Sequence, residues 1–101
     1  MDTRRYIDFE WDDRKAAANV KKHGVSFESA ADAFSDPHAC VLPNTRHSDY
    51  EERFFVIGLD LESRALTVCH CERCGDSTIR IISARKSTRT EEQQYWRYRN
   101  E

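Results

Sequence analysis

The stretch Thr78–Arg89 reads TIRIISARKSTR, and its first seven residues decide the fold. Alternate residues of a strand point to opposite faces of a sheet. The two faces of this strand would carry Arg80 with Ile82 on one side, and Ile79, Ile81 and Ser83 on the other. Because isoleucine occurs on both faces, the stretch predicts a central strand that is covered at least partly on both sides.

Two earlier segments have the same character and extend the sheet. They read RFFVIGL at residues 53–59 and ALTVCHC at residues 65–71. The polar connection at 60–64 makes them partners in a hairpin. A second turn at 72–77 leads into Thr78. Together the three segments predict an antiparallel β-meander.

Helical patterns come before the sheet. Asp12 or Asp13 can cap a helix through RKAAANVKK, and Gly24 marks its end because glycine tolerates a positive φ. Ser26 can cap a second helix, FESAADAF, whose alanines and phenylalanines form an apolar face. Asp36-Pro37 stops that helix. These residues predict a short helical hairpin.

The ends of the chain complete a mixed architecture. Residues 6–9 read as a short edge strand, residues 38–42 as another short strand, and residues 43–51 as a polar loop. Thr88 and Glu91 have the spacing of a capping box for a last helix through EEQQYWRYR. The order predicts an α+β fold: a short N-terminal strand, two helices, an antiparallel β-meander and a C-terminal helix.

Composition limits the size and the class of the protein. A chain of 101 residues has room for a single domain, residues 1–101. With 39% apolar and 34% charged residues it has the balance of a folded protein. Its longest uncharged apolar segment, Phe54–Leu59, is far too short to span a membrane. We expect a cytoplasmic protein with reduced thiols and no membrane partner.

The segment VCHCERCG at residues 68–75 raises the question of a metal site. Cys71 and Cys74 have the spacing of half a zinc knuckle, which needs a second half to close a tetrahedral site. Only Cys69 and Cys40, with His38 close to the latter, are left to supply it. We therefore expect the cysteines to be packing and turn residues, with no bound metal and no cofactor.

Cations gather at the end of the predicted last strand. Arg80, Arg85 and Lys86 repel one another unless a negative group meets them, and a guanidinium can bind a phosphate with two hydrogen bonds. This pattern predicts a phosphate-binding site on a protein whose net charge is only −2. The alternative is a salt bridge from each arginine to an acid such as Glu52 or Glu72.

Two further residue types allow both a functional and a structural interpretation. His23, at the end of the first predicted helix, could serve as a general acid or base, or could simply cap the helix. Aromatic residues of the last helix, among them Tyr95, more often pack than stack on RNA bases.

Several segments together resemble one protein family. They are FEWDDRKAAANVKKHGVSFESAADAFSDP, then EERFFVIG, VCHCERCGD and above all IRIISARKST. In this order they resemble the BrnT toxins of bacterial type II toxin–antitoxin systems. The resemblance runs from Phe9 to about Tyr95, and the segments are specific in combination. The turn Cys74–Ser77 departs from the pattern, which puts only the conformation of that turn in doubt.

The resemblance implies a fold, an activity and partners. It implies a RelE-like fold and a ribonuclease that needs no metal ion and arrests translation by cleaving RNA. It also implies neutralisation by a BrnA-like ribbon-helix-helix antitoxin, with operator DNA bound only through the toxin–antitoxin complex. A rival interpretation is a non-catalytic binding module that acts only through a partner DNA-binding protein.

Roles for individual residues follow from the resemblance and from the chemistry of RNA cleavage. That reaction needs a base, cations on the developing phosphorane and an acid. The candidate catalytic residues are Arg80 and Arg85 for charge stabilisation, His23 as acid or base, Glu52 as second choice for the base, and His70 if its face is exposed. The candidate RNA-binding residues are Lys22 beside His23, Lys86 and Arg89 for flanking phosphates, and Tyr95 to orient the RNA.

Overall fold

The computed structural model describes residues 8–42, 46–47, 52–73 and 78–101. These residues form three helices, α1 (Asp13–His23), α2 (Phe27–Phe34) and α3 (Arg89–Arg99). They also form six strands, β1 (Asp8–Glu10), β2 (Cys40–Val41), β3 (Arg46–His47), β4 (Glu52–Leu59), β5 (Ala65–Arg73) and β6 (Thr78–Lys86). The side chains of Arg46, His47, Glu52 and Arg73 are not among the described features. No described helix is long and apolar enough to cross a membrane.

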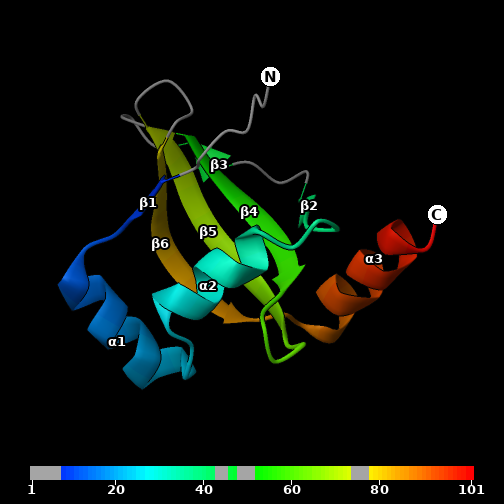
Figure 1. Cartoon of the computed structure of the whole chain (residues 1–101), viewed down its shortest axis with the longest axis horizontal. Helices are drawn as coiled ribbons and strands as arrows, with labels where there is room; N and C mark the ends of the chain where they lie inside the picture. Colours follow the sequence, from blue (N-terminus) through cyan, green and yellow to red (C-terminus); the bar gives the residue numbers. More distant parts are fainter. Residues whose placement is uncertain (1–7, 43–45, 48–51, 74–77) are drawn as a thin grey trace, which may run out of the picture.

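The strands form a mixed sheet in the order β1-β6-β5-β4-β2, with β3 also paired to β4 (Figure 1). The predicted α+β fold and the β4-β5-β6 meander are confirmed. The sheet as a whole is mixed, because β1, which the sequence predicts only as an edge strand, pairs with β6 in parallel. The order along the chain does not reveal this pairing, since β1 reaches the edge of a strand that lies about 70 residues later.

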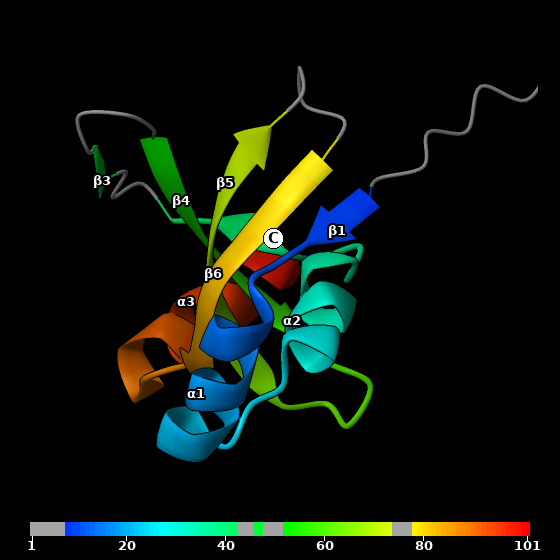
Figure 2. The ribbon, with the colours of Figure 1, turned by 90° about the vertical axis from the view of Figure 1, so that its left-hand side faces the viewer.

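The main core lies between the sheet and the two helices α1 and α2 (Figure 1). We call this side of the sheet the helix face. Its fully buried residues come from α2 and the turn before it and from the two central strands: Val25, Phe27, Ala30, Ala33, Leu66, Val68, Ile79, Ile81 and Ala84. The opposite side, part of which α3 covers, is the α3 face (Figure 2).

A register shift changes which residues of β6 face the core. Cys69 pairs with Ser83 and His70 pairs with Ile81, so Ile82 is an additional residue in β6. After this bulge Ala84, and not Ser83, continues the buried row of Ile79 and Ile81. The predicted alternation is therefore correct up to Ile81 and wrong at Ser83, because a bulge cannot be seen from the apolar pattern of one strand.

The predicted helix ends are confirmed. The Asp12 carboxylate accepts hydrogen bonds from the backbone N–H groups of Arg14 and Lys15, and Gly24 ends α1 with φ of 69°. Ser26 caps α2. The buried Asn19 side chain binds the carbonyl of Val25 and both the N–H and the carbonyl of Ala84. This amide joins α1, the following turn and β6.

A smaller core holds α3 against the sheet. Tyr95 is fully buried against Ile57 and Cys40. Its hydroxyl donates to Asp36 at 2.6 Å and accepts from Arg99 at 3.1 Å. The Asp36 oxygen that binds Tyr95, Oδ2, also accepts a hydrogen bond from the backbone N–H of Leu59 at 2.9 Å. Asp36 therefore links the end of α2, the end of β4 and α3, and these hydrogen bonds lower its pKa although burial opposes them.

Gly58 allows α2 to lie directly on β4. A Cβ atom at this position would be 2.0 Å from the carbonyl oxygen of Ala33. We predict that Gly58→Ala lowers the free energy of unfolding by about 1–3 kcal/mol or more, because backbone must move to admit the methyl group. Urea denaturation measures the change.

Gly24 provides the control for this substitution. A Cβ atom there would have no neighbour within 4 Å, and asparagine tolerates a positive φ better than most residues. Gly24→Asn should therefore cost less than Gly58→Ala. A Gly58→Ala protein as stable as the wild type would show that the close contact between α2 and β4 is wrong.

Candidate active site on the α3 face of the sheet

The register of the strands arranges the α3 face in rows. The row under α3 consists of Ile57, Thr67 and Arg85. The next row consists of Phe55, Cys69 and Ser83. The row farthest from α3 contains Cys71, Arg80 and Glu10. No described helix lies over the last two rows, which makes this half of the face the candidate site (Figure 2).

An ion pair occupies the far row. Arg80 donates from one terminal nitrogen to a Glu10 carboxylate oxygen at 2.7 Å. The side chains are 31% and 39% exposed, respectively, so solvent or a ligand can reach both. Asp12 lies close by, and its pKa is lowered mainly by the backbone N–H groups of Lys15 and Arg14, with a smaller contribution from Arg80. Arg80 thus binds Glu10 and has a second, weaker electrostatic neighbour in Asp12, the residue before α1.

A second arginine extends the far row. Arg53 directly precedes Phe54, whose partner His70 lies on the helix face, so alternation places Arg53 on the α3 face beside Cys71. Its backbone partner on β3 is Arg46. Sequence reasoning missed Arg53 and Glu10 as site residues. Each is adjacent in sequence to a phenylalanine, Phe54 and Phe9 respectively, so strand alternation predicts that it points to the opposite face of the sheet. To place Glu10 beside Arg80, however, the pairing of β1 with β6 must also be known.

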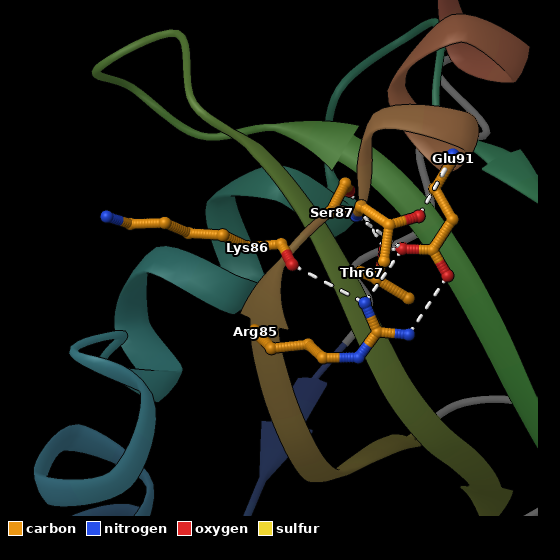
Figure 3. Close-up of polar contacts among 6 residues, drawn as sticks. Thr67, Arg85, Lys86, Ser87 and Glu91 are labelled. Atoms are coloured by element: carbon orange, nitrogen blue, oxygen red, sulfur yellow. Dashed lines mark hydrogen bonds and ion pairs between the residues drawn. The ribbon is translucent and has the colours of Figure 1, made fainter.

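Arg85 is held by Glu91 in a closed network (Figure 3). Its two terminal nitrogens donate to the two Glu91 oxygens at 2.7 and 2.9 Å. The same carboxylate accepts from the Thr67 hydroxyl and from the backbone N–H of Thr88, both at 2.9 Å. These bonds, first of all those from Arg85, lower the pKa of Glu91 to about 2, and the Glu91 side chain raises the pKa of Arg85.

This network gives Arg85 a structural task. It ties the first turn of α3 to β5 and β6, and the Thr88–Glu91 capping box that the sequence predicts is part of it. The predicted role of Arg85 in stabilising charge on a phosphate stays a prediction: both terminal nitrogens already bind Glu91, while the side chain is 38% exposed. The carbonyl of Lys86, the next residue, accepts a hydrogen bond from Arg85 at 3.4 Å, while the Lys86 side chain points away from the network and is exposed (Figure 3).

A family model describing the ribonuclease toxin BrnT of type II toxin–antitoxin systems matches residues 11–91. The chain belongs to the BrnT toxin family. The crystal structure of the Brucella abortus ribonuclease toxin BrnT is similar, with a TM-score of 0.61 and 24% sequence identity. That match covers 83% of this chain and 100% of the Brucella chain, and it supports the fold. No protein in a set of curated sequences matches the chain.

The structure does not bring His23 to Arg80 in this BrnT family member. The helix α1 begins beside Arg80 and passes Ala84 at Asn19, so it runs along β6 in the same direction. Its 11 residues extend roughly 16 Å. His23 and Lys22 therefore lie at the opposite end from Arg80, near the end of β6. Lys22, Lys86 and Arg89 are all exposed there.

His70 and Tyr95 are both buried, which contradicts any direct contact with RNA. His70 is 2% exposed on the helix face, between the rings of Phe34 and Phe54. The condition for its catalytic role, an exposed face, is not met. Tyr95 is fully buried and packs α3 on the sheet, so the prediction that it orients RNA is wrong. The sequence suggested both residues because of their side-chain chemistry. It could not reveal that they are buried, because burial depends on which face of the sheet each helix covers.

The prediction that the cysteines are packing residues is confirmed for the three whose side chains the structure describes. Cys40, Cys69 and Cys71 are buried, and burial raises the pKa of the Cys40 thiol. Cys74 and the rest of its turn lie outside the described residues, as does the side chain of Glu52. Within the described part of the chain, no group of at least three His, Cys, Asp or Glu residues is placed to hold a metal ion.

The Glu91 network predicts an uneven effect of neighbouring substitutions. Glu91→Gln should lower the free energy of unfolding by about 1–3 kcal/mol, because it leaves the Arg85 charge without its partner. Glu92→Gln, on the exposed side of the same turn, should change it by less than about 0.5 kcal/mol. Thermal and urea denaturation of both variants provide the comparison. Equal effects would contradict the structural role of Glu91.

His70 predicts acid sensitivity of the fold. Burial lowers its pKa from 6.5 to about 4, and its Nδ1 atom has no hydrogen-bond partner among the described residues. Between these pH values the unfolded chain binds more protons, so the free energy of unfolding should fall as the pH drops from about 6.5 towards 4. The loss attributable to His70 should approach roughly 3 kcal/mol.

The variant His70→Phe tests the origin of this slope. It should flatten the dependence of the unfolding free energy on pH within this window, whereas His38→Ala, at an exposed position, should not. Urea denaturation at a series of pH values measures the slopes. An unchanged slope in His70→Phe would show that other groups cause the acid sensitivity.

Proposed function

We propose that this BrnT family member is a metal-independent endoribonuclease that cleaves RNA at the Glu10–Arg80 pair. The observation that carries the proposal is this partly exposed ion pair in the half of the α3 face that no described helix covers. A carboxylate and a guanidinium side by side supply a base and a cation. Attack of an RNA 2′-hydroxyl on the adjacent phosphorus needs both.

The two side chains divide the chemistry between them. Glu10 accepts the proton of the 2′-hydroxyl as its oxygen attacks the phosphorus. The bond from phosphorus to the 5′-oxygen then breaks, which leaves a 2′,3′-cyclic phosphate, and water supplies the proton that the leaving 5′-oxygen takes up. Arg80 donates hydrogen bonds to the phosphate oxygens, on which charge builds up in the phosphorane. A guanidinium has several N–H donors, so Arg80 can hold Glu10 and a phosphate oxygen at the same time. Asp12, which precedes α1, adds negative charge near Arg80, and Arg80 in turn contributes in a small way to lowering the Asp12 pKa.

The surrounding cations define a path for the RNA backbone. Arg53 lies two strands from Arg80 in the far row, roughly 10 Å away, which suits a neighbouring phosphate. Lys22, Lys86 and Arg89 lie exposed at the other end of the sheet, where they contact phosphates farther along the strand. Cleavage of messenger RNA at such a site would arrest translation.

Neutralisation follows from covering this face. We propose a BrnA-like antitoxin whose ribbon-helix-helix domain binds operator DNA on behalf of the complex. An antitoxin that covers the α3 face must present acidic groups to Arg80 and Arg53, so the association rate should fall as ionic strength rises.

The first test is cleavage of single-stranded RNA by the purified protein in excess EDTA. We predict full activity in the chelator and a loss of roughly 10²–10³ in rate for Arg80→Ala, since one contact to the transition state is removed. Arg14→Ala, an exposed arginine of α1, is the matched control and should keep the wild-type rate.

Two results would contradict the proposal. Loss of activity in EDTA would rule out the metal-independent reaction. Full activity of Arg80→Ala would place the site elsewhere. A non-catalytic binding module remains the second candidate because both Arg80 and Arg85 have carboxylate partners, as purely structural arginines do. In that case the wild-type protein would bind RNA or antitoxin without cleaving either.

A further inference from the structure

The bulge in β6 brings a serine hydroxyl onto the same face of the sheet as Arg80. Residues three apart in a regular strand point to opposite faces. Arg80 and Ser83 are three apart, but their partners on β5, Cys71 and Cys69 respectively, are only two apart. Because Ile82 is the additional residue, Ser83 joins Arg80 on the α3 face, in the row that borders the far row. Bulges are frequent beside active sites, where they re-aim a side chain in this way.

The Ser83 hydroxyl is available to a ligand. The side chain is half-buried, and its hydroxyl has no hydrogen-bond partner within residues 8–42, 46–47, 52–73 and 78–101. Two other hydroxyls near the end of β6 differ in this respect: Thr67 and Ser87 share a hydrogen bond at 2.9 Å, and Thr67 also donates to Glu91. No described helix lies over the row of Ser83, so this free donor faces the candidate site (Figure 2).

The spacing of Ser83 and Arg80 fits a single phosphate group. Two strand steps separate the two residues on this face, which corresponds to roughly 7 Å between their Cα atoms. A hydrogen bond to a phosphate oxygen is about 2.8 Å long, so two donors on opposite oxygens of one phosphate lie up to roughly 8 Å apart. Arg80 uses one terminal nitrogen to bind Glu10, and a guanidinium keeps further N–H groups for such a contact.

We propose that the Ser83 hydroxyl donates a hydrogen bond to a non-bridging oxygen of the phosphate that is cleaved. The inference rests on the proposed function, because it concerns the phosphate that Arg80 binds. Negative charge develops on both non-bridging oxygens of the phosphorane, and Arg80 meets one while Ser83 meets the other. The serine keeps its proton throughout, while the bond to the 2′-oxygen forms and the bond to the 5′-oxygen breaks. Two donors also fix the orientation of the phosphorus towards the attacking oxygen.

The test begins with cleavage of single-stranded RNA in EDTA. Ser83→Ala should lower kcat roughly 10²–10³-fold, the usual loss when one donor to a developing oxyanion is removed. Ser83→Thr keeps a hydroxyl and suits a strand, so it should retain most of the wild-type rate. Thr90→Ala, which removes an exposed hydroxyl from α3, is the matched control and should keep the wild-type kcat. The urea midpoint of Ser83→Ala should equal that of the wild type.

Sulfur in place of one non-bridging oxygen identifies the contact directly. Sulfur accepts hydrogen bonds weakly, and the two phosphorothioate diastereomers each replace one of the two oxygens. The wild-type protein should cleave one diastereomer more slowly because its Ser83 contact is weakened. In Ser83→Ala this particular slowing should disappear, since no hydroxyl is left to be affected. A merely structural effect of the substitution would leave the slowing of both diastereomers as it is in the wild type.

The outcomes separate this contact from the proposed function. Wild-type kcat in Ser83→Ala would overturn the inference even if Arg80→Ala abolishes cleavage. A low kcat with unchanged slowing of both diastereomers would also overturn it. A low kcat together with loss of the slowing of one diastereomer would support it, even if Arg80→Ala still cleaves RNA.

A binding measurement decides the matter if the wild-type protein does not cleave RNA and the proposed function fails. The probe is a single-stranded 2′-O-methyl RNA hexanucleotide, which lacks the attacking hydroxyl and stays intact. A hydrogen bond from Ser83 to an RNA phosphate predicts binding about 2- to 12-fold weaker in Ser83→Ala and close to the wild-type value in Ser83→Thr. Equal binding by all three proteins would overturn the inference.

Discussion

The carboxylate of Glu91 determines where α3 lies, and the rest of the candidate site depends on that position. It accepts both N–H groups of the Arg85 fork, the Thr67 hydroxyl and the first N–H of the helix cap. These bonds fix α3 over one row of the α3 face. The other anchor is Tyr95, bound to Asp36 and buried on Ile57. With α3 held at this end, Arg80 and Glu10 remain accessible at the other.

This arrangement gives the two arginines of one strand different tasks. Arg85 and Arg80 lie on the same face of β6 and both meet a carboxylate. The partner of Arg85 accepts four hydrogen bonds and is only 17% exposed, so it holds the Arg85 fork firmly although Arg85 itself is 38% exposed. The partner of Arg80 is an exposed residue of an edge strand. An ion pair of this second kind contributes little to stability and can exchange partners readily, as a phosphate site requires.

Local patterns were enough to predict most of the secondary structure. The caps at Asp12, Ser26 and Thr88 and the stop at Gly24 are short-range features, and each is confirmed. The parallel pairing of β1 with β6 and the bulge at Ile82 are not visible in this way. Both depend on which distant strand fills an edge and on how the register adjusts to it.

The candidate site was predictable only in part, for the same reason. Arg80 could be chosen because an arginine within an apolar strand needs an anion. Its actual neighbour Glu10 lies 70 residues earlier and became visible only in the folded sheet. His23 and His70 were chosen by their chemistry alone. The direction of α1 and the cover of α2 place them respectively at the far end and in the core.

The most direct test of the central claim is to map the RNA contacts residue by residue. Amide and arginine side-chain resonances of nitrogen-15-labelled protein would be recorded while a single-stranded 2′-O-methyl RNA hexanucleotide, which lacks the attacking hydroxyl and stays intact, is added. The account predicts that the largest shifts occur at Glu10, Arg80 and Ser83, with Arg85 unaffected. Shifts confined to Lys22, His23 and Lys86, with none at Glu10 or Arg80, would contradict it.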